Sequence, residues 1–228
     1  MNTRQNDIAK RNERVACVLF DLDGTLTDSG EGVMGSAAYA FRKLGLPVPE
    51  PRELRTMVGP PLSSSFPRLG VPQDKVEEAI AYYRDDYNDG GGKLRNSVFP
   101  GIEEMLRDLK EKGLRLFVAT SKPEGIAREV LTTFGLTGYL EYIAGASSDR
   151  SRETKADVLR HLLEETGYPE GLVMVGDTIW DVLGARELGI PCVGVSWGYG
   201  EDQDMLDAGA ETVVATPKDL TKYLIGND

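Results

Sequence analysis

The amino-acid sequence predicts an α/β fold: a parallel sheet with helices on both faces, interrupted after its first strand by a small all-helical segment. From Val98 onward, short β-branched runs alternate with amphipathic helical segments, which is typical of parallel sheets. Residues 15–20 form an apolar run that suits the first strand of the same sheet. Between Asp28 and Ser97 the strand rhythm disappears, so we expect an insertion there rather than a second sheet.

The part of the chain after the insertion supplies the remaining elements in order. Residues 101–112 carry apolar side chains at helical spacing, and Gly113 ends that helix. The same patterns predict the strands 114–119, 142–146, 172–175 and 192–195 and the helices 123–134, 154–166 and 178–188. This alternation is Rossmann-like, and in such sheets a ligand binds at the carboxyl ends of the strands.

The insertion is expected to consist of helices and proline-rich connections. Helical patterns cover residues 33–44 and 73–87, and the remainder is punctuated by Pro47, Pro49, Pro51, Pro60, Pro61 and Pro67. Its hinges are expected at residues 30–32 and 93–97. The Gly59-Pro60-Pro61 loop is the best candidate for a contact with a ligand, because proline stiffens the backbone and glycine permits close approach.

These patterns divide the chain into three parts. Residues 1–14 are polar, lack the apolar stretch of a signal peptide and are expected to form a flexible tail. Residues 15–27 and 98–228 form the predicted α/β core domain, and residues 28–97 form the predicted helical domain.

Composition and charge restrict the partners of the protein. The 228 residues have a formal charge of −11, which disfavours binding to nucleic acid and to acidic membrane surfaces. No apolar run is long enough to cross a bilayer. Cys17 and Cys192 lie in apolar runs and suit reduced core thiols, so a cytoplasmic location is expected.

The first chemical signal is the sequence Asp21-Leu22-Asp23-Gly24-Thr25 at the end of the first strand. Side chains alternate along a strand, so Asp21 and Asp23 project to the same side. Two carboxylates this close repel each other and need a cation or a shared proton. An ordinary Asp-rich turn remains an alternative on this signal alone.

A second pair of carboxylates follows the strand 172–175. Asp177 lies at the tip of that strand, and Asp181 lies one helical turn further along the chain. Either could simply cap the helix that begins there. If the two strand tips share one edge of the sheet, four carboxylates converge and imply a divalent cation. Oxygen ligands favour a hard ion, and Mg²⁺ is the first candidate.

Two weaker signals suggest a phosphate site. Thr120, Ser121 and Lys122 follow a predicted strand, where a hydroxyl and backbone N–H groups can hold phosphate oxygens. Lys155 opens a predicted helix and could supply a cation to the same group. Each lysine taken separately is more commonly a solvated surface residue.

Taken together, the four signals in this order resemble the motifs of the haloacid dehalogenase superfamily of phosphohydrolases. The resemblance spans about residues 15 to 226, and the helical insertion occupies the position of that superfamily's first type of cap domain. The segments 28–33, 98–101, 155–158 and 198–200 resemble the branch of phosphoglycolate phosphatases and 5′-nucleotidase-like enzymes.

The resemblance implies a role for each matched residue. Asp21 would be the nucleophile and Asp23 the general acid and base, with Thr120 and Lys155 stabilising the transferring phosphoryl group. Gly24, Ser121 and Lys122 would help to bind the phosphate. Mg²⁺ would be held by Asp21, the Asp23 carbonyl and Asp177, with Asp181 nearby.

The expected activity is therefore hydrolysis of a small phosphate monoester, such as phosphoglycolate or a nucleoside monophosphate, by a monomer or homodimer. A sugar-phosphate mutase would share the core motifs. A phosphoacceptor signalling domain of the receiver type also phosphorylates an Asp, but it places its acidic groups on different strands and lacks a large insertion. A serine-hydrolase elbow at residues 194–198 would need a later histidine, and His161, the single histidine, precedes it.

Overall fold

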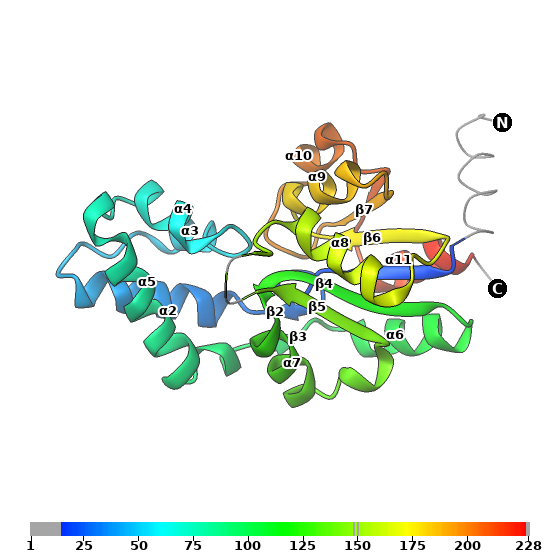
Figure 1. Cartoon of the computed structure of the whole chain (residues 1–228), viewed down its shortest axis with the longest axis horizontal. Helices are drawn as coiled ribbons and strands as arrows, with labels where there is room; N and C mark the ends of the chain where they lie inside the picture. Colours follow the sequence, from blue (N-terminus) through cyan, green and yellow to red (C-terminus); the bar gives the residue numbers. More distant parts are fainter. Residues whose placement is uncertain (1–14, 148, 150, 227–228) are drawn as a thin grey trace.

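The computed structural model describes residues 15–147, 149 and 151–226, and the proposed tail 1–14 lies outside these residues. Its centre is a six-stranded parallel sheet in the order β5-β4-β1-β6-β7-β8 (Figure 1). The strands are β1 (Cys17–Phe20), β4 (Arg115–Pro123), β5 (Tyr142–Ala146), β6 (Leu172–Gly176), β7 (Cys192–Val195) and β8 (Thr212–Val214). The prediction of an α/β fold with a parallel sheet is confirmed.

The buried apolar residues of the strands explain why helices cover both faces of the sheet. In β1, Val18 and Phe20 join one apolar cluster, whereas Cys17 and Leu19 join another, because side chains alternate across a strand. All four residues are almost completely buried. A strand buried on both sides must be covered on both faces, as in other parallel sheets.

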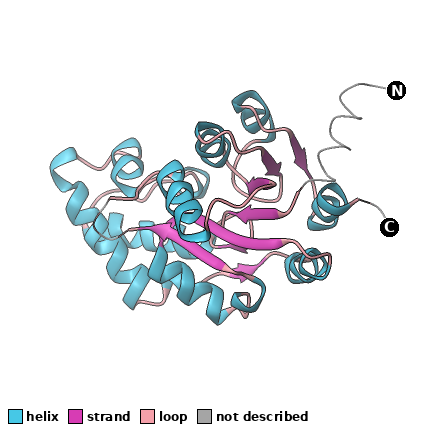
Figure 2. Ribbon diagram, turned by 45° about the vertical axis from the view of Figure 1, so that its right-hand side comes forward, coloured by secondary structure: helices cyan, strands magenta, loops and turns pink. Residues whose placement is uncertain are grey.

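The helices divide between these two clusters (Figure 2). Apolar residues of α6 (Ile102–Glu111), α7 (Glu124–Thr133) and α11 (Pro217–Ile225) pack on the face of Val18 and Phe20. Those of α8 (Lys155–Thr166), α9 (Ile179–Glu187) and α10 (Asp202–Ala208) pack on the opposite face. Cys17 and Cys192 are free and buried, as the sequence predicts.

The inserted residues form a separate helical body at the left of Figure 1. It contains α2 (Gly30–Lys43), α3 (Pro51–Arg55), α4 (Leu62–Arg68) and α5 (Val76–Arg84), followed by a π-helical turn η2 (Asp85–Asp89). The 3₁₀ turns η1 (Gln73–Lys75) and η3 (Gly92–Leu94) also belong to the insertion, whereas the 3₁₀ turn η4 (Thr137–Tyr139) lies in the core between α7 and β5. The inserted helices bury their own apolar cluster, centred on Phe41, Phe66 and Tyr83.

Two details of the insertion differ from the sequence prediction. Helices α3 and α4 lie in the proline-rich part where none was expected: Pro51 occupies the first helical position, where it loses no hydrogen bond, and Pro67 is tolerated near the end of α4. The expected hinge at residues 30–32 is the first turn of α2. Where the chain leaves the core for the insertion and where it returns, the two segments pair as a small antiparallel ribbon of β2 (Thr27–Asp28) and β3 (Ser97–Val98).

None of the helices in the described part of the chain has the length and apolar character needed to cross a membrane.

Candidate active site

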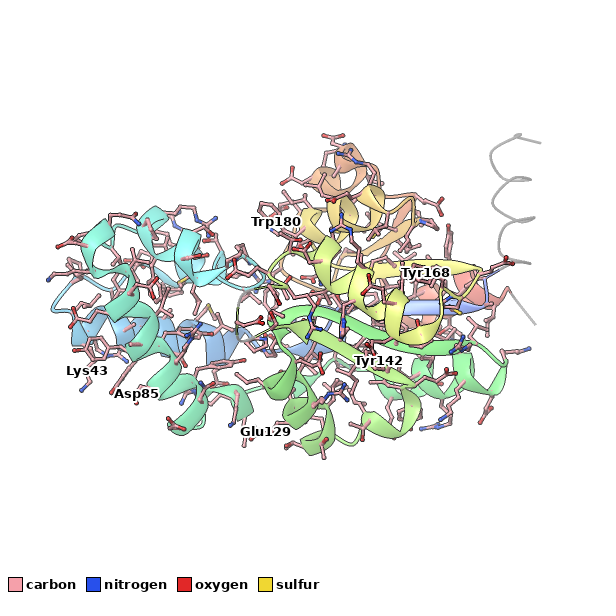
Figure 3. The ribbon with its side chains drawn as sticks, in the orientation of Figure 1. Lys43, Asp85, Glu129, Tyr142, Tyr168 and Trp180 are labelled. Atoms are coloured by element: carbon pink, nitrogen blue, oxygen red, sulfur yellow. The ribbon has the colours of Figure 1, made fainter. Side chains whose placement is uncertain are left out.

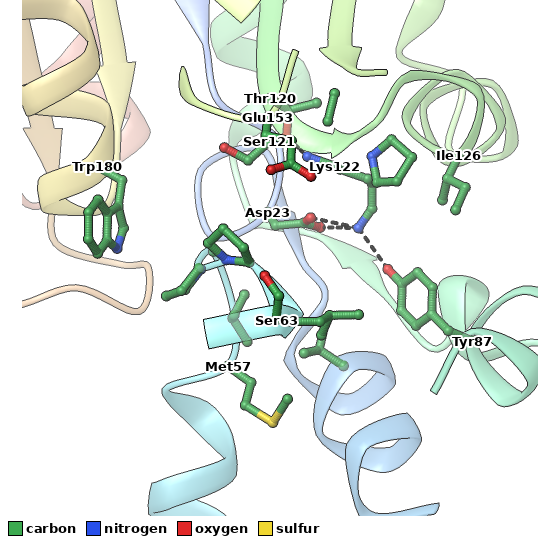
Figure 4. A pocket seen from close by; sticks show the side chains of 18 of the residues that line it. Asp23, Met57, Ser63, Tyr87, Thr120, Ser121, Lys122, Ile126, Glu153 and Trp180 are labelled. Atoms are coloured by element: carbon green, nitrogen blue, oxygen red, sulfur yellow. Dashed lines mark hydrogen bonds and ion pairs between the residues drawn. The ribbon is translucent and has the colours of Figure 1, made fainter. Parts of the chain in front are cut away.

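The chemical signals of the sequence meet at the carboxyl ends of three neighbouring strands. Asp21 directly follows β1, Thr120 lies in β4, and Asp177 directly follows β6, and these strands are adjacent in the sheet. Asp21, Asp23, Thr120 and Lys155 line one cavity of about 420 Å³ between this edge and the inserted helices. The close-up in Figure 4 places Asp23 between Thr120 and the inserted helices.

Lys155 connects the nucleophile candidate with Asp181. Its Nζ lies 2.7 Å from Oδ1 of Asp21 and 2.9 Å from Oδ1 of Asp181, and it donates a hydrogen bond to the Ala119 carbonyl. The lysine is buried and occupies the first turn of α8, whose start is fixed by a capping box between Thr154 and Asp157. Burial lowers the pKa of Lys155, but the carboxylates of Asp181 and Asp21 outweigh this and raise it.

Asp177 is held by two donors from separate segments. Thr25 Oγ1 donates to one carboxylate oxygen at 3.2 Å, and the Tyr199 backbone N–H donates to the other at 2.8 Å. A Cβ atom at Gly24 or at Gly198 would overlap the Asp177 side chain. Gly24, assigned to phosphate binding from the resemblance, therefore clears space for a metal-ligand candidate in this structure.

The carboxylates of Asp21, Asp177 and Asp181 form a buried cluster in which one oxygen of each lies within 4.8 Å of the others. Burial is the largest cause that raises the pKa of Asp21 to about 6, and burial with the neighbouring Asp181 raises the pKa of Asp177. Three buried carboxylates this close repel one another, and a cation beside them would relieve that repulsion.

The cluster fits a hard divalent cation. Oδ1 of Asp21 and Oδ1 of Asp181 lie within ion-pair distance of Lys155, yet neither accepts a well-directed hydrogen bond from a described residue. These buried oxygens therefore have coordination capacity to spare. All three side chains offer oxygen ligands, which Mg²⁺ prefers.

Asp23 belongs to a different group of contacts. Lys122 Nζ donates to both of its carboxylate oxygens, at 2.6 and 2.8 Å, and to the hydroxyl of Tyr87 at 2.7 Å (Figure 4). Tyr87 comes from the inserted helical segment, so a single lysine joins the proposed general acid to that segment. Lys122 is predicted to bind the phosphate, and in this structure it lines the cavity and its ammonium contacts Asp23.

Thr120 and Ser121 line the cavity beside Lys122, as the sequence predicts. The Thr120 hydroxyl is buried and accepts a hydrogen bond from the Lys122 backbone N–H at 3.2 Å. Its own proton therefore remains available to an oxygen of a bound phosphate.

The inserted helices supply the opposite wall of the cavity. The Gly59-Pro60-Pro61 loop lines it, as expected. The sequence reasoning missed further lining residues, which are Tyr83, Arg84, Tyr87 and Asn88 of the insertion and Trp180 of α9 in the core. A signal existed in the spacing of Tyr83 and Tyr87, which stack at 5.2 Å, but such a pair on a helix usually indicates a core contact.

Buried carboxylates that crowd a cavity cost folding free energy, and such groups persist where chemistry requires them. The fold and this cavity therefore define an α/β enzyme that acts at the carboxyl edge of its parallel sheet. A family model described as haloacid dehalogenase-like hydrolase matches residues 18–195, which include Asp21, Asp23, Thr120, Lys155, Asp177 and Asp181. The chain belongs to this family.

Two curated relatives illustrate the range of similar proteins. The chain is 48% identical over 198 residues to the tyrosine-protein kinase PtkA of Mycobacterium tuberculosis (strain ATCC 25618 / H37Rv), covering 86% of this chain and 67% of the relative. It is 38% identical over 190 residues to a 5′-nucleotidase of Pseudomonas aeruginosa, covering 82% of this chain and 86% of the relative.

Solved structures of similar proteins have the same fold as this chain. A predicted phosphatase from Clostridium acetobutylicum superposes with a TM-score of 0.87 at 38% sequence identity, covering 92% of this chain and 98% of that one. The structure of Mycobacterium tuberculosis PtkA has a TM-score of 0.83 at 45% identity, covering 93% of this chain and 99% of that one.

Proposed function

We propose that the protein is an Mg²⁺-dependent phosphatase that hydrolyses small phosphate monoesters through an aspartyl-phosphate on Asp21. The observation that carries this proposal is the contact of Asp21 with buried Lys155 in a cavity that Asp23 also lines. A nucleophile and a separate acid–base group facing one cavity are what a two-step phosphoryl transfer needs. Relatives named as a 5′-nucleotidase and a phosphoglycolate phosphatase support the substrate class.

In the first step, an Asp21 oxygen attacks phosphorus and the bond to the leaving oxygen breaks. Asp23 donates a proton to that oxygen, and Thr120 and Lys155 bind the phosphoryl oxygens. In the second step, Asp23 takes a proton from a water molecule that attacks phosphorus, which releases inorganic phosphate and restores Asp21.

Asp21, Asp177 and the Asp23 backbone carbonyl would hold Mg²⁺, with Asp181 beside them. The bound ion supplies positive charge that lets the anionic nucleophile approach an anionic phosphate. Asp181 also accepts hydrogen bonds from the Thr178 backbone N–H and hydroxyl, at 3.1 and 3.0 Å, which orient its carboxylate at the start of α9.

The remaining parts of the proposal concern domains and partners. The inserted residues 28–97 would act as a cap that excludes water from the cavity. The enzyme would work in the cytoplasm as a monomer or homodimer, without nucleic acid or membrane. The name of one close relative specifies a tyrosine kinase, so the test must distinguish phosphate release from phosphate transfer.

The test measures inorganic phosphate released from p-nitrophenyl phosphate with Mg²⁺, beside phosphate transfer from ATP to tyrosine in the same preparation. We expect steady release by the wild type, and a loss of at least ~10³-fold for Asp21→Asn, because an amide cannot form the intermediate. A folded Asp21→Asn variant that keeps more than a tenth of the rate would refute the mechanism. Tyrosine phosphorylation without phosphatase turnover would refute the proposed reaction.

A further inference from the structure

An uncommon turn of the inserted segment determines where Tyr87 lies. The π-helical turn η2 directly follows α5, and Tyr87 is its middle residue. Such turns are rare and are found frequently at functional sites. Asp85, the first residue of η2, is exposed on the inserted helical body (Figure 3), whereas Tyr87 is buried and lines the cavity. The turn therefore directs one aromatic side chain towards the proposed active site.

The Tyr87 hydroxyl completes the contacts of the Lys122 ammonium group. An ammonium group has three N–H donors, and Lys122 Nζ contacts three acceptors, which are the two Asp23 carboxylate oxygens and the Tyr87 hydroxyl. Burial, and then the Asp23 carboxylate, raise the pKa of Tyr87, so the hydroxyl stays neutral. Because Lys122 is buried, displacing the Tyr87 hydroxyl would leave one N–H donor without this acceptor. The direction of the Asp23 carboxylate therefore depends on the position of Tyr87.

Asp86, the residue before Tyr87, connects η2 with two other parts of the insertion. Its Oδ2 accepts a hydrogen bond from Ser36 Oγ of α2 at 2.7 Å and forms an ion pair with Arg95, which lies between η3 and β3. The Arg95 guanidinium also donates to Ser36 Oγ at 3.3 Å. Ser36 is fully buried and the other two side chains are partly buried, so water and salt screen these contacts less than those of an exposed ion pair.

The backbones of the same three parts pack together without space for a side chain. A Cβ atom at Gly92 of η3 would lie 2.5 Å from Ser36 Oγ and 2.7 Å from the Tyr87 Cα atom. A Cβ atom at Gly32 of α2 would lie 2.1 Å from the Gly92 carbonyl oxygen. Glycine permits this close approach. The turn that carries Tyr87 is therefore fixed both to α2 and to the segment through which the chain returns to the core.

We propose that Asp86 is a positioning residue for the acid–base group Asp23. With its two partners Asp86 fixes η2, and this turn holds Tyr87 on Lys122. Neither Asp86 nor its two partners belong to the described residues that line the cavity, so they act through Tyr87 and not on the substrate. The inference rests on the proposed phosphatase function, in which Asp23 donates a proton to the leaving oxygen.

The experiment compares kcat for two substrates of similar size, p-nitrophenyl phosphate and p-nitrobenzyl phosphate. The phenolate leaves without a proton, whereas the benzyl alkoxide needs one from Asp23, so the ratio of the two kcat values reports proton donation. In Asp86→Ala and in Tyr87→Phe, we expect kcat for the benzyl ester to fall about 5-fold further than kcat for the phenyl ester, which is the effect that one hydrogen bond gives. Retained turnover of p-nitrophenyl phosphate reports that each variant folds.

The double variant Asp86→Ala/Tyr87→Phe tests whether the two residues act on one path. If Asp86 acts through Tyr87, the ratio changes about 5-fold in the double variant, as in each single variant, and not by the ~25-fold product of two independent effects. Asp86→Asn keeps an oxygen acceptor for Ser36 and loses the charge that pairs with Arg95, so it should change the ratio about 3-fold in the same direction. It replaces Asp86→Ala in both measurements if that variant does not fold.

Glu129→Ala is the matched control, because it removes an ion pair from the same return segment without a change at η2. Glu129 is exposed on α7 of the core (Figure 3), and its carboxylate lies 2.9 Å from Lys93 Nζ of η3. This variant should leave the ratio within about 2-fold of the wild type, since an ion pair at the surface contributes little.

The outcomes separate the two proposals. The positioning role is overturned, and the phosphatase function stands, if Asp86→Ala leaves the ratio unchanged or if the effects of Asp86 and Tyr87 multiply. It is also overturned if Glu129→Ala changes the ratio as much as Asp86→Ala does. If the folded wild type releases phosphate from neither substrate in the presence of Mg²⁺, the proposed function itself fails.

Discussion

At the scale of single residues, Lys122 makes contacts that the sequence does not predict. It lies 2.6 Å from Asp23 and 2.7 Å from the Tyr87 hydroxyl, and all three side chains line the cavity. The lysine therefore fixes the direction in which the Asp23 carboxyl group points. A proton donor must lie within hydrogen-bond reach of the leaving oxygen, so this orientation matters for catalysis.

We predict that Lys122→Met slows poor leaving groups more than good ones. An alkyl phosphate needs protonation of its leaving oxygen, whereas p-nitrophenolate leaves without it, so kcat for the alkyl ester should fall at least ~10-fold further. Tyr87→Phe should produce a smaller change of the same kind. The measurement is the ratio of kcat for the two substrates, with Asp23→Asn as the reference pattern. Equal losses on both substrates would show that Lys122 has only a general structural or binding role.

At the scale of elements, the loop after β7 connects the carboxylate cluster with the inserted helices. Its Tyr199 N–H binds Asp177, and the Tyr199 hydroxyl contacts Asp28 and the Gly30 N–H at the start of α2. Arg55 of α3 donates to the Gly198 carbonyl at 2.9 Å and lies over the Tyr199 ring. Displacing this loop would therefore disturb the metal-ligand candidate and the insertion together.

Gly198→Ala tests this connection without backbone strain, because Gly198 does not have a positive φ. The added methyl group would overlap Asp177, so we expect the Mg²⁺ concentration for half-maximal activity to rise by about 10-fold or more. Gly125→Ala is the matched control: it lies on α7 with no atom near the added methyl group, and it should leave the Mg²⁺ dependence unchanged. The result that contradicts this role is an unchanged Mg²⁺ titration in Gly198→Ala.

At the scale of the whole molecule, the buried carboxylates link metal binding to folding. Asp21, Asp177 and Asp181 come from the ends of β1 and β6 and the start of α9, so they meet only in the folded chain. A cation that binds this cluster binds the native state in preference to the unfolded chain, and it therefore stabilises the fold by mass action.

Metal removal should consequently affect both activity and stability. We expect EDTA to stop phosphate release and to lower Tm, and added Mg²⁺ to restore both. Mg²⁺ at about 100 times its Kd contributes about 2.7 kcal/mol. Ca²⁺ should restore Tm but support turnover poorly, because it prefers more ligands at longer distances. Full activity after exhaustive dialysis against EDTA would contradict the metal role.

The sequence by itself determined the parallel sheet and the identity of its chemical groups. Local patterns sufficed for this, because a strand that is buried on both faces must consist of apolar residues. Asp21 and Asp177 directly follow two such apolar runs in the sequence. The segments 142–146 and 192–195 coincide with β5 and β7. The proline-rich helices α3 and α4 were missed, because proline at a helix start resembles proline in a loop when only the sequence is considered.

Only the tertiary structure decided how the side chains pair. Lys155 meets Asp21 and Asp181, whereas Lys122 meets Asp23 and Tyr87. In each of these pairs the two residues are far apart in the sequence. Local periodicity carries no information about such contacts. Tertiary structure also decides the wall of the cavity. The inserted helices pack around their own apolar cluster and present one side to the carboxyl edge of the sheet.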